Sequence, residues 1–273
     1  TAKESLVISC VFQSLIIIFL ALSASLTAFA QRADPRDPKN VELGAELLKK
    51  AVAARGGDRY LAFKAILTTG QFTSFDKGVS TTPRQFMDWI VYPDKERTEF
   101  GKGKKKDRII QVNAGKTGWI YDGDAQTLKD QSDQQIKTHL EGIEFDIDRI
   151  LRSSWKEPGA EVWFWGREEI RPGERANVVE IKLKNDLLIY LWLDRNTNLP
   201  MSLIYEKTEE GALVKRETRY FQYIDYENVK FPNIVDFYRN GVQEGRINLQ
   251  SAKLDPPITE DLWVKPASIK AIK

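Results

Sequence analysis

Carboxylates are the side chains in this sequence whose type and spacing could do acid–base chemistry. Glu141, Glu144 and Asp148 follow one another at spacings of three and four residues, which puts them on one face of a helix. Two carboxylates in different environments can act as general acid and general base. The same spacing is typical of the charged, solvent-facing side of an amphipathic helix, and that is the interpretation we favour.

The sequence does not contain the motifs of several other classes of enzyme site. His139 is its one histidine and Cys10 its one cysteine, so a two-histidine zinc motif cannot form. Neither G-x-S-x-G, nor a phosphate-binding glycine loop, nor a dinucleotide fingerprint occurs. We therefore expect no enzyme activity, no cofactor and no metal. A carboxylate-dependent hydrolase stays open as an alternative, because spacing across strands cannot be read from a sequence.

The carboxylates belong to the clearest helix that the sequence predicts, from about residue 133 to residue 152. Ser132 and Gln135 form a capping box at its start. Apolar residues recur at alternating spacings of four and three, which is one face of a helix. They are Ile136, Leu140, Ile143, Ile147 and Ile150. At about 30 Å this helix is long enough to cover an open sheet as a lid.

A second apolar surface is predicted in the stretch 85–123, where turns at Pro93 and Gly115 separate short strands. Strand alternation places bulky side chains on one face of the first and of the third strand. They are Met87, Trp89, Val91, Trp119 and Tyr121. We expect this face, together with Leu140, Ile143 and Ile147, to line an apolar binding cavity. Plain packing within a sheet is the alternative.

Charge and composition exclude some partners. The net charge is +2, from 41 basic and 39 acidic residues, which is too small to attract nucleic acid. Seven Trp, nine Tyr and thirteen Phe make aromatic residues the distinctive part of the composition. A basic hairpin tip at 101–108 could touch anionic lipid head groups, although a solvated tip is the interpretation we favour.

The tryptophan strands carry a resemblance to a known family. Trp89 and Pro93 are followed by the Gly115-Lys116-Thr117 turn, Trp119 and Tyr121, and the C-terminus holds a D-x-W-x-x-P segment at 261–266. In these positions the chain resembles the periplasmic outer-membrane lipoprotein-sorting proteins of the LolA/LolB-like superfamily. The resemblance implies an α+β fold in which about eleven antiparallel strands form a half-open barrel. Helices would cap its concave face, which holds acyl chains.

One position departs from the family. The carriers have an arginine just before the proline, which latches the helical lid, and this chain has Tyr92 there. A phenol offers one donor against five in guanidinium. We therefore expect a looser lid, held mainly by the apolar face of the helix at 133–152.

The chain order predicts the domain organisation. Residues 1–30 have a basic start, an apolar run and the cleavage site Ala28-Phe29-Ala30, and are predicted to be a signal peptide. A retained anchor is the alternative, although the run is shorter than the ~20 residues of a membrane span. We expect a flexible leader at 31–40 and a single domain at 41–273. That domain should open with a helix at 41–55 and end in seven strands between residue 161 and residue 254.

These observations favour a monomeric periplasmic carrier for acyl chains of lipids or lipoproteins. A membrane surface or an envelope transporter is expected as a further contact, and nucleic acid is not. The alternative of a different class is a lipid-sensing or interaction module of the cell envelope.

Overall fold

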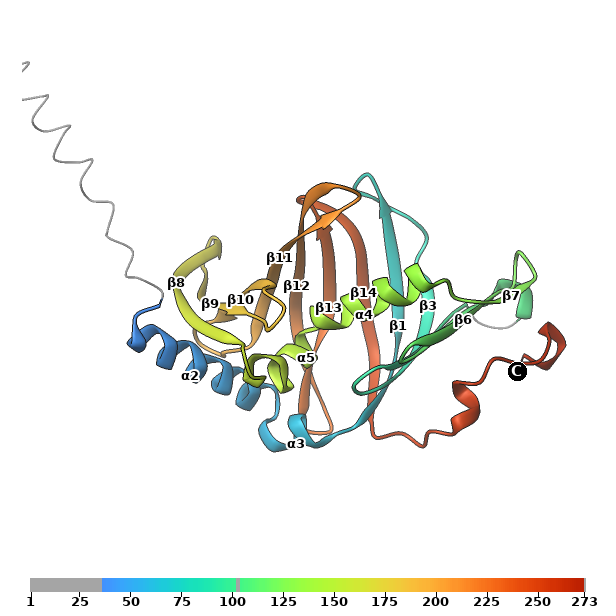
Figure 1. Cartoon of the computed structure of the whole chain (residues 1–273), viewed down its shortest axis with the longest axis horizontal. Helices are drawn as coiled ribbons and strands as arrows, with labels where there is room; N and C mark the ends of the chain where they lie inside the picture. The colour runs from blue at the N-terminus through green and yellow to red at the C-terminus, as the bar shows by residue number, and fades with distance from the viewer. Residues whose placement is uncertain (1–35, 102–103, 273) are drawn as a thin grey trace, which may run out of the picture. The chain divides into compact units, whose positions relative to one another are not determined.

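The computed structural model describes residues 36–101 and 104–272, so the predicted signal peptide lies outside the described residues. The chain divides into two units, Thr1–Asp37 and Pro38–Lys273, and the fold is that of the second. It is one antiparallel sheet of 14 strands that curves around the helices without closing (Figure 1). The expected α+β half-barrel is confirmed.

The strands form two meanders that meet at β1. Along the sheet the order is β7-β6-β5-β4-β3-β1-β14-β13-β12-β11-β10-β9-β8, with β2 paired to β1. The first and last strands of the chain are therefore neighbours, and β7 and β8 are the two edges. The first half contains β1 (Ala65–Asp76), β2 (Val79–Ser80), β3 (Arg84–Val91), β4 (Lys95–Phe100), β5 (Ile109–Ala114), β6 (Thr117–Asp122) and β7 (Thr127–Asp130). The second half contains β8 (Glu161–Arg171), β9 (Glu174–Lys182), β10 (Leu188–Asp194), β11 (Pro200–Glu209), β12 (Ala212–Tyr226), β13 (Val229–Arg239) and β14 (Val242–Leu254).

The sheet has more strands than the eleven expected. One of the additional strands is β7, which is short and polar, with the sequence TLKD. A segment with so few apolar residues shows no alternating hydrophobic pattern. Its pairing with β6 makes it a strand.

The N-terminal helix is longer than expected. Helix α2 spans Pro38–Arg55, so the leader expected at 31–40 ends earlier and Asn40 lies inside the helix. Proline suits a first helical turn, where its missing N–H is not needed. Gly56, with φ of 134°, ends α2, and a Cβ there would meet Asn228 O at 2.5 Å. The short helix α3 (Gly57–Ala62) follows.

The helix expected at 133–152 is interrupted. It consists of α4 (Asp133–Glu144) and α5 (Ile147–Arg152), and the capping box of Ser132 and Gln135 is confirmed. Between the two helices Asp146 accepts hydrogen bonds from the amides of Asp148 and Arg149, both at 2.9 Å, and so begins a new helix. Among residues 36–101 and 104–272, no helix has the length and hydropathy needed to cross a membrane.

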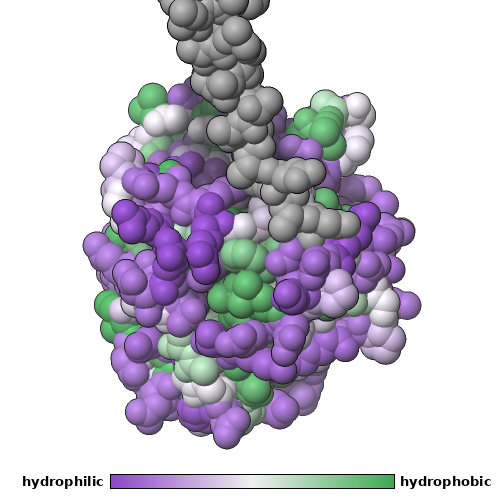
Figure 2. Space-filling model, turned by 90° about the vertical axis from the view of Figure 1, so that its left-hand side faces the viewer, coloured by the Kyte–Doolittle hydropathy of each residue, from purple (hydrophilic) through white to green (hydrophobic). Residues whose placement is uncertain are grey.

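The main core lies between the helices and the second half of the sheet. Leu48 and Ala51 of α2, Ile150 of α5, and Ile189 and Leu191 of β10 are fully buried in it. Helix α2 packs on β8 at the end of the sheet, which Figure 2 views from outside. There, hydrophilic side chains surround a smaller apolar area. The core therefore anchors α2 and α5, whereas α4 contributes no buried residue.

Candidate ligand cavity

A cavity of about 810 Å³ lies between the sheet and helices α4 and α5. Its volume is within the roughly 300–1,000 Å³ of small-molecule sites. Much of the apolar part of its wall comes from β3, β13 and β14 of the sheet. It includes Phe86, Ile90, Val235, Phe237, Ile247 and Leu249. In Figure 1, α4 and α5 run across the strands that supply this wall.

Strand β3 presents to the cavity the face opposite to the expected one. Phe86 and Ile90 line the cavity, so strand alternation places Met87, Trp89 and Val91 on the other face of the sheet. Met87 is 37% exposed there. The expectation that these three residues line the cavity is corrected, because both faces of β3 are apolar and only the tertiary fold decides which one is enclosed.

The other aromatic residues of the expected site belong to a separate cluster. Trp119 and Tyr121 are buried with Trp263 and Ile272, and Trp89 packs against them. The indole of Trp119 donates a hydrogen bond to Trp263 O at 3.0 Å, and the hydroxyl of Tyr121 donates to Lys105 O at 3.1 Å. The C-terminal segment 255–272, which includes the D-x-W-x-x-P motif, therefore supplies residues that cover them. Trp89, Trp119 and Tyr121 therefore lie together, as expected, but outside the cavity.

The helical part of the expected site is mostly at the cavity. Ile143 of α4 and Ile147 of α5 line it, and so does Phe145 between them, whose ring stacks on Tyr205 with 3.5 Å between centroids. Leu140 is half-buried and does not belong to the lining. Helix α4 thus contributes His139, Gly142 and Ile143, all from its C-terminal half.

Asp148 is the centre of a polar group in the cavity lining. Its Oδ1 accepts hydrogen bonds from Arg55 Nη2 and from the hydroxyl of Tyr60, both at 2.8 Å, and its Oδ2 accepts one from the hydroxyl of Tyr92 at 3.1 Å. The Arg55 side chain is 1% exposed and that of Asp148 13%. Burial, with the Asp148 charge as second cause, raises the pKa of Tyr60 and of Tyr92, so both phenols stay donors.

This network corrects two expectations. Asp148 does not share the solvent-facing side with Glu141, because the helix restarts at Asp146 and turns the carboxylate inward. Tyr92, at the expected latch position, does contact the lid helix, through one hydrogen bond. The ion pair at this position joins Arg55 of α2 to Asp148 of α5, so β3 supplies neither of its charges.

Arg152 adds a second tie between α5 and the rest of the fold. Its Nη2 donates to the carbonyl groups of Leu61 and Phe63. The guanidinium lies 4.3 Å from the centroid of the Phe63 ring and 4.2 Å from that of Tyr92. Stacking of this kind stabilises a cation in an apolar environment, so α5 is held at both of its ends.

A second polar group lies further along β3 and β4. Asp88 accepts a hydrogen bond from Thr98 Oγ1 at 2.8 Å, and Glu96 Oε2 lies 3.4 Å from Nδ1 of His139. Burial raises the pKa of Asp88 to about 7, and burial together with the Asp88 charge raises the pKa of Glu96 to about 8. Burial also lowers the pKa of His139. Asp88 and Glu96 were not among the predicted site residues, although an acid at an inward position of an alternating strand is a sequence signal for such a pair.

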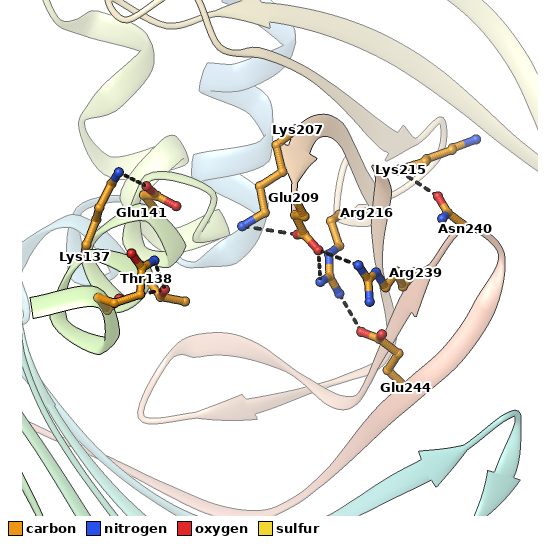
Figure 3. Close-up of polar contacts among 11 residues, drawn as sticks. Lys137, Thr138, Glu141, Lys207, Glu209, Lys215, Arg216, Arg239, Asn240 and Glu244 are labelled. Carbon is orange, nitrogen blue, oxygen red and sulfur yellow. Dashed lines mark hydrogen bonds and ion pairs between the residues drawn. The ribbon is translucent and has the colours of Figure 1, made fainter. Parts of the chain in front are cut away.

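A cluster of charged residues connects β11, β12, β13 and β14. Glu209 of β11 contacts Arg216 at 2.7 Å, Arg239 at 3.1 Å and Lys207 at 3.3 Å (Figure 3). Arg216 also contacts Glu244 of β14 at 2.5 Å. Hydrogen bonding from Arg216 lowers the pKa of Glu209 to about 2. These contacts tie β11 to β14 at the ends of the hairpins, while Figure 3 shows that α4 residues pair among themselves.

The basic tip expected at 101–108 is described except for residues 102–103. Lys104, Lys105 and Lys106 are exposed there, as a solvated tip requires. Arg108 is only 15% exposed and contacts Glu99 at 2.5 Å. Unlike the three lysines, Arg108 therefore packs against the sheet, through Glu99 of β4.

The comparisons with known proteins identify the fold. No protein-family model matches the sequence, and no curated protein matches it. Solved structures do match. A LolA superfamily protein from Nitrosomonas europaea is 11% identical with a TM-score of 0.53, over 81% of this chain and 97% of that one.

Two further structures support the same assignment. A DUF1329 family protein from Desulfovibrio piger has a TM-score of 0.58 at 12% identity, over 82% of this chain and 97% of that one. A domain described as an outer membrane lipoprotein-sorting protein, from Vibrio parahaemolyticus, has a TM-score of 0.51 at 14% identity, over 81% and 96%. At these identities the likeness shows the fold, which is LolA-like as the tryptophan motif predicted.

Proposed function

We propose that this protein is a periplasmic carrier that binds acyl chains of lipids or lipoproteins in the cavity beneath α4 and α5. The observation that carries the proposal is the apolar cavity of about 810 Å³ under a helical lid. Burying one CH₂ group contributes ~0.8 kcal/mol, so a sixteen-carbon chain contributes on the order of 12 kcal/mol before the costs of binding. Shape and apolar lining are then sufficient for affinity.

In the empty carrier the lid divides into a part that is tied to the fold and a part that can move. Helix α5 is tied down by Asp148 and Arg152 and has buried residues in the core. Helix α4 has none, and its half-buried Ile143 faces the cavity. Elements with few buried contacts open at low free energy. Entry of a chain is therefore proposed to begin with displacement of α4.

Location and partners complete the proposal. Residues 1–30 are proposed as the export signal, and the domain that follows as a monomeric binding protein without enzyme activity. The Vibrio parahaemolyticus structure with the same fold is described as a lipoprotein-sorting domain, which supports acyl chains as the cargo. A membrane surface or an envelope transporter would deliver or receive them.

The first test is recovery of the protein from cells, followed by native mass spectrometry and lipid extraction. We expect a mature chain that begins at Gln31 and carries acyl-containing lipid. A preparation that copurifies a protein partner and no lipid would favour a sensor, and a bare monomer that takes up no acyl chain in solution would contradict the carrier.

A pair of variants then places the chain in the cavity. Ile143→Asp puts a charge into the cavity wall, whereas Met87→Asp puts the same charge on the outer face of β3. We expect Ile143→Asp to weaken binding of a fluorescent fatty acid at least tenfold and Met87→Asp to leave it unchanged. Equal affinities in the two folded variants would exclude this cavity as the site.

A further inference from the structure

The groups around Asp148 form a complete oxyanion site. Arg55 Nη2 and the hydroxyls of Tyr60 and Tyr92 lie 2.8, 2.8 and 3.1 Å from its two oxygens. None of these donors belongs to α5. Arg55 ends α2, Tyr60 lies in α3, and Tyr92 follows β3. The donors therefore stay together when α5 moves, and they then need another acceptor.

Two guanidinium groups beside Asp148 have unused donor capacity. Nη1 of Arg55 is buried without a hydrogen-bond partner among the described residues, and so is Nη1 of Arg152, which belongs to α5 itself. Nε of Arg55 is already used, because it donates to Lys230 O at 2.6 Å. The guanidinium of Arg55 contacts Asp148, and that of Arg152 lies over the ring of Tyr92. Two cationic groups thus lie around a single carboxylate, Asp148.

The position of this site links it to the cavity. Arg55, Tyr92, Asp148 and Arg152 all line the cavity, and the last two belong to α5. The apolar wall of β13 and β14 and these polar residues thus belong to one cavity, so an amphiphile can place its acyl chain on the wall and its head group at the polar residues. Guanidinium and phenol donors bind anionic head groups through charge-assisted hydrogen bonds, which are stronger than those to a neutral head group.

We propose that this is a head-group subsite for an oxyanion, which Asp148 fills in the empty carrier and the carboxylate or phosphate of a bound amphiphile fills in the loaded one. The inference rests on the proposed function and names its cargo as anionic amphiphiles. Exchange of one oxyanion for another keeps the buried donors satisfied. The ligand thereby releases Asp148 and, with it, the tie between α5 and the sheet.

The test compares four ligands with the same sixteen-carbon chain: palmitate, hexadecyl phosphate, hexadecanol and hexadecylamine. Each displaces a fluorescent neutral acyl probe from the full mature protein. We expect palmitate or hexadecyl phosphate to bind at least tenfold more tightly than hexadecanol, and the stronger of the two identifies a fatty-acid or a phosphate head group. Equal affinity of the alcohol and both anions would overturn the subsite and leave the carrier intact.

Other outcomes are equally decisive. Preference for hexadecylamine would overturn the proposal and point to the acceptors Asp88 and Glu96 instead. Binding of none of the four chains would remove the proposed function and the subsite together.

Variants test separately the role of Asp148, which competes with the ligand, and the role of the donors Tyr60 and Tyr92. Asp148→Asn weakens the internal competitor, so palmitate should bind several-fold more tightly while hexadecanol is unchanged. Tyr60→Phe and Tyr92→Phe each remove one donor and should reduce the preference for palmitate over hexadecanol. Glu141→Gln, which removes an exposed carboxylate from α4, is the matched control and should leave both affinities unchanged. Hexadecanol affinity in each variant reports that the cavity is folded, and an unaltered preference in all three site variants would refute the subsite.

Discussion

The hydroxyl of Tyr92 donates a hydrogen bond to Oδ2 of Asp148 at 3.1 Å, and this contact joins the end of β3 to helix α5. If this hydrogen bond is lost, Asp148 still accepts hydrogen bonds from Arg55 and Tyr60. The bond therefore adjusts how firmly the lid is held without leaving a buried charge unpaired.

Tyr92→Phe should loosen the lid while preserving the fold. The variant loses one hydrogen bond, so we expect the free energy of unfolding to fall by about 1 kcal/mol and the off-rate of a bound acyl probe to rise severalfold. Stopped-flow displacement measures the off-rate. Tyr223→Phe is the control, since its hydroxyl donates to Pro200 O at 3.0 Å and not to the lid. An off-rate that changes equally in both variants would mean that Tyr92 has no special connection to opening.

Trp119→Phe should affect stability and leave binding alone. The indole is 3% exposed and donates to Trp263 O, so its replacement removes apolar contact and one hydrogen bond on the outer face of the sheet. We expect a loss of about 1–3 kcal/mol in chemical denaturation. Affinity for a fluorescent fatty acid should be unchanged in the folded variant. Weakened binding there would show that the outer cluster communicates with the cavity.

Strand β3 shows how far alternation predicts a site. The pattern correctly separates Trp89 and Val91 from Phe86 and Ile90, because successive side chains point to opposite faces. Both sets are apolar, so nothing local indicates which one is enclosed. The outer set is covered by Trp263, a residue far along the chain, and such long-range packing leaves no periodic signal near β3.

The lid helix shows a second limit. Its apolar spacing predicts Ile143 and Ile147 at the cavity, where they lie, and the capping box predicts its start. The interruption at Asp146 was not predicted, because a short Asp side chain that caps a second helix looks like one more charged residue in a continuous one. That break turns Asp148 toward Arg55, and the polar centre of the site depends on it.

The buried acids should make stability depend on pH. Burial raises the pKa of Asp88 to about 7 and of Glu96 to about 8, whereas the unfolded chain has values near 4. Between about pH 4 and pH 8 the folded state therefore holds more protons, and the free energy of unfolding should decrease as pH rises through this range. Melting temperatures measured from pH 5 to pH 9 should fall accordingly.

The matching variant is Asp88→Asn, which keeps an acceptor for Thr98 and cannot ionise. We expect it to flatten the decline of melting temperature with pH. Glu141→Gln, on the exposed side of α4, should leave the decline as it is. A wild-type protein whose stability rises steadily from pH 5 to pH 9 would contradict the assignment of these acids.

Asp148→Ala should be far more damaging than the loss of a surface ion pair. It leaves the Arg55 guanidinium, which is 1% exposed, without its carboxylate, and we expect a loss of about 3–5 kcal/mol in the free energy of unfolding. Asp130→Ala removes an exposed partner of Lys265 at 2.8 Å and should cost no more than about 1 kcal/mol. The double variant Arg55→Met with Asp148→Leu removes both charges and should recover much of the loss, because no buried ion is left unpaired. Denaturant titration of the three proteins measures the differences. If the double variant were as unstable as Asp148→Ala, the cost would come from packing around α5, and the charge pair would not be what holds the lid helix to α2.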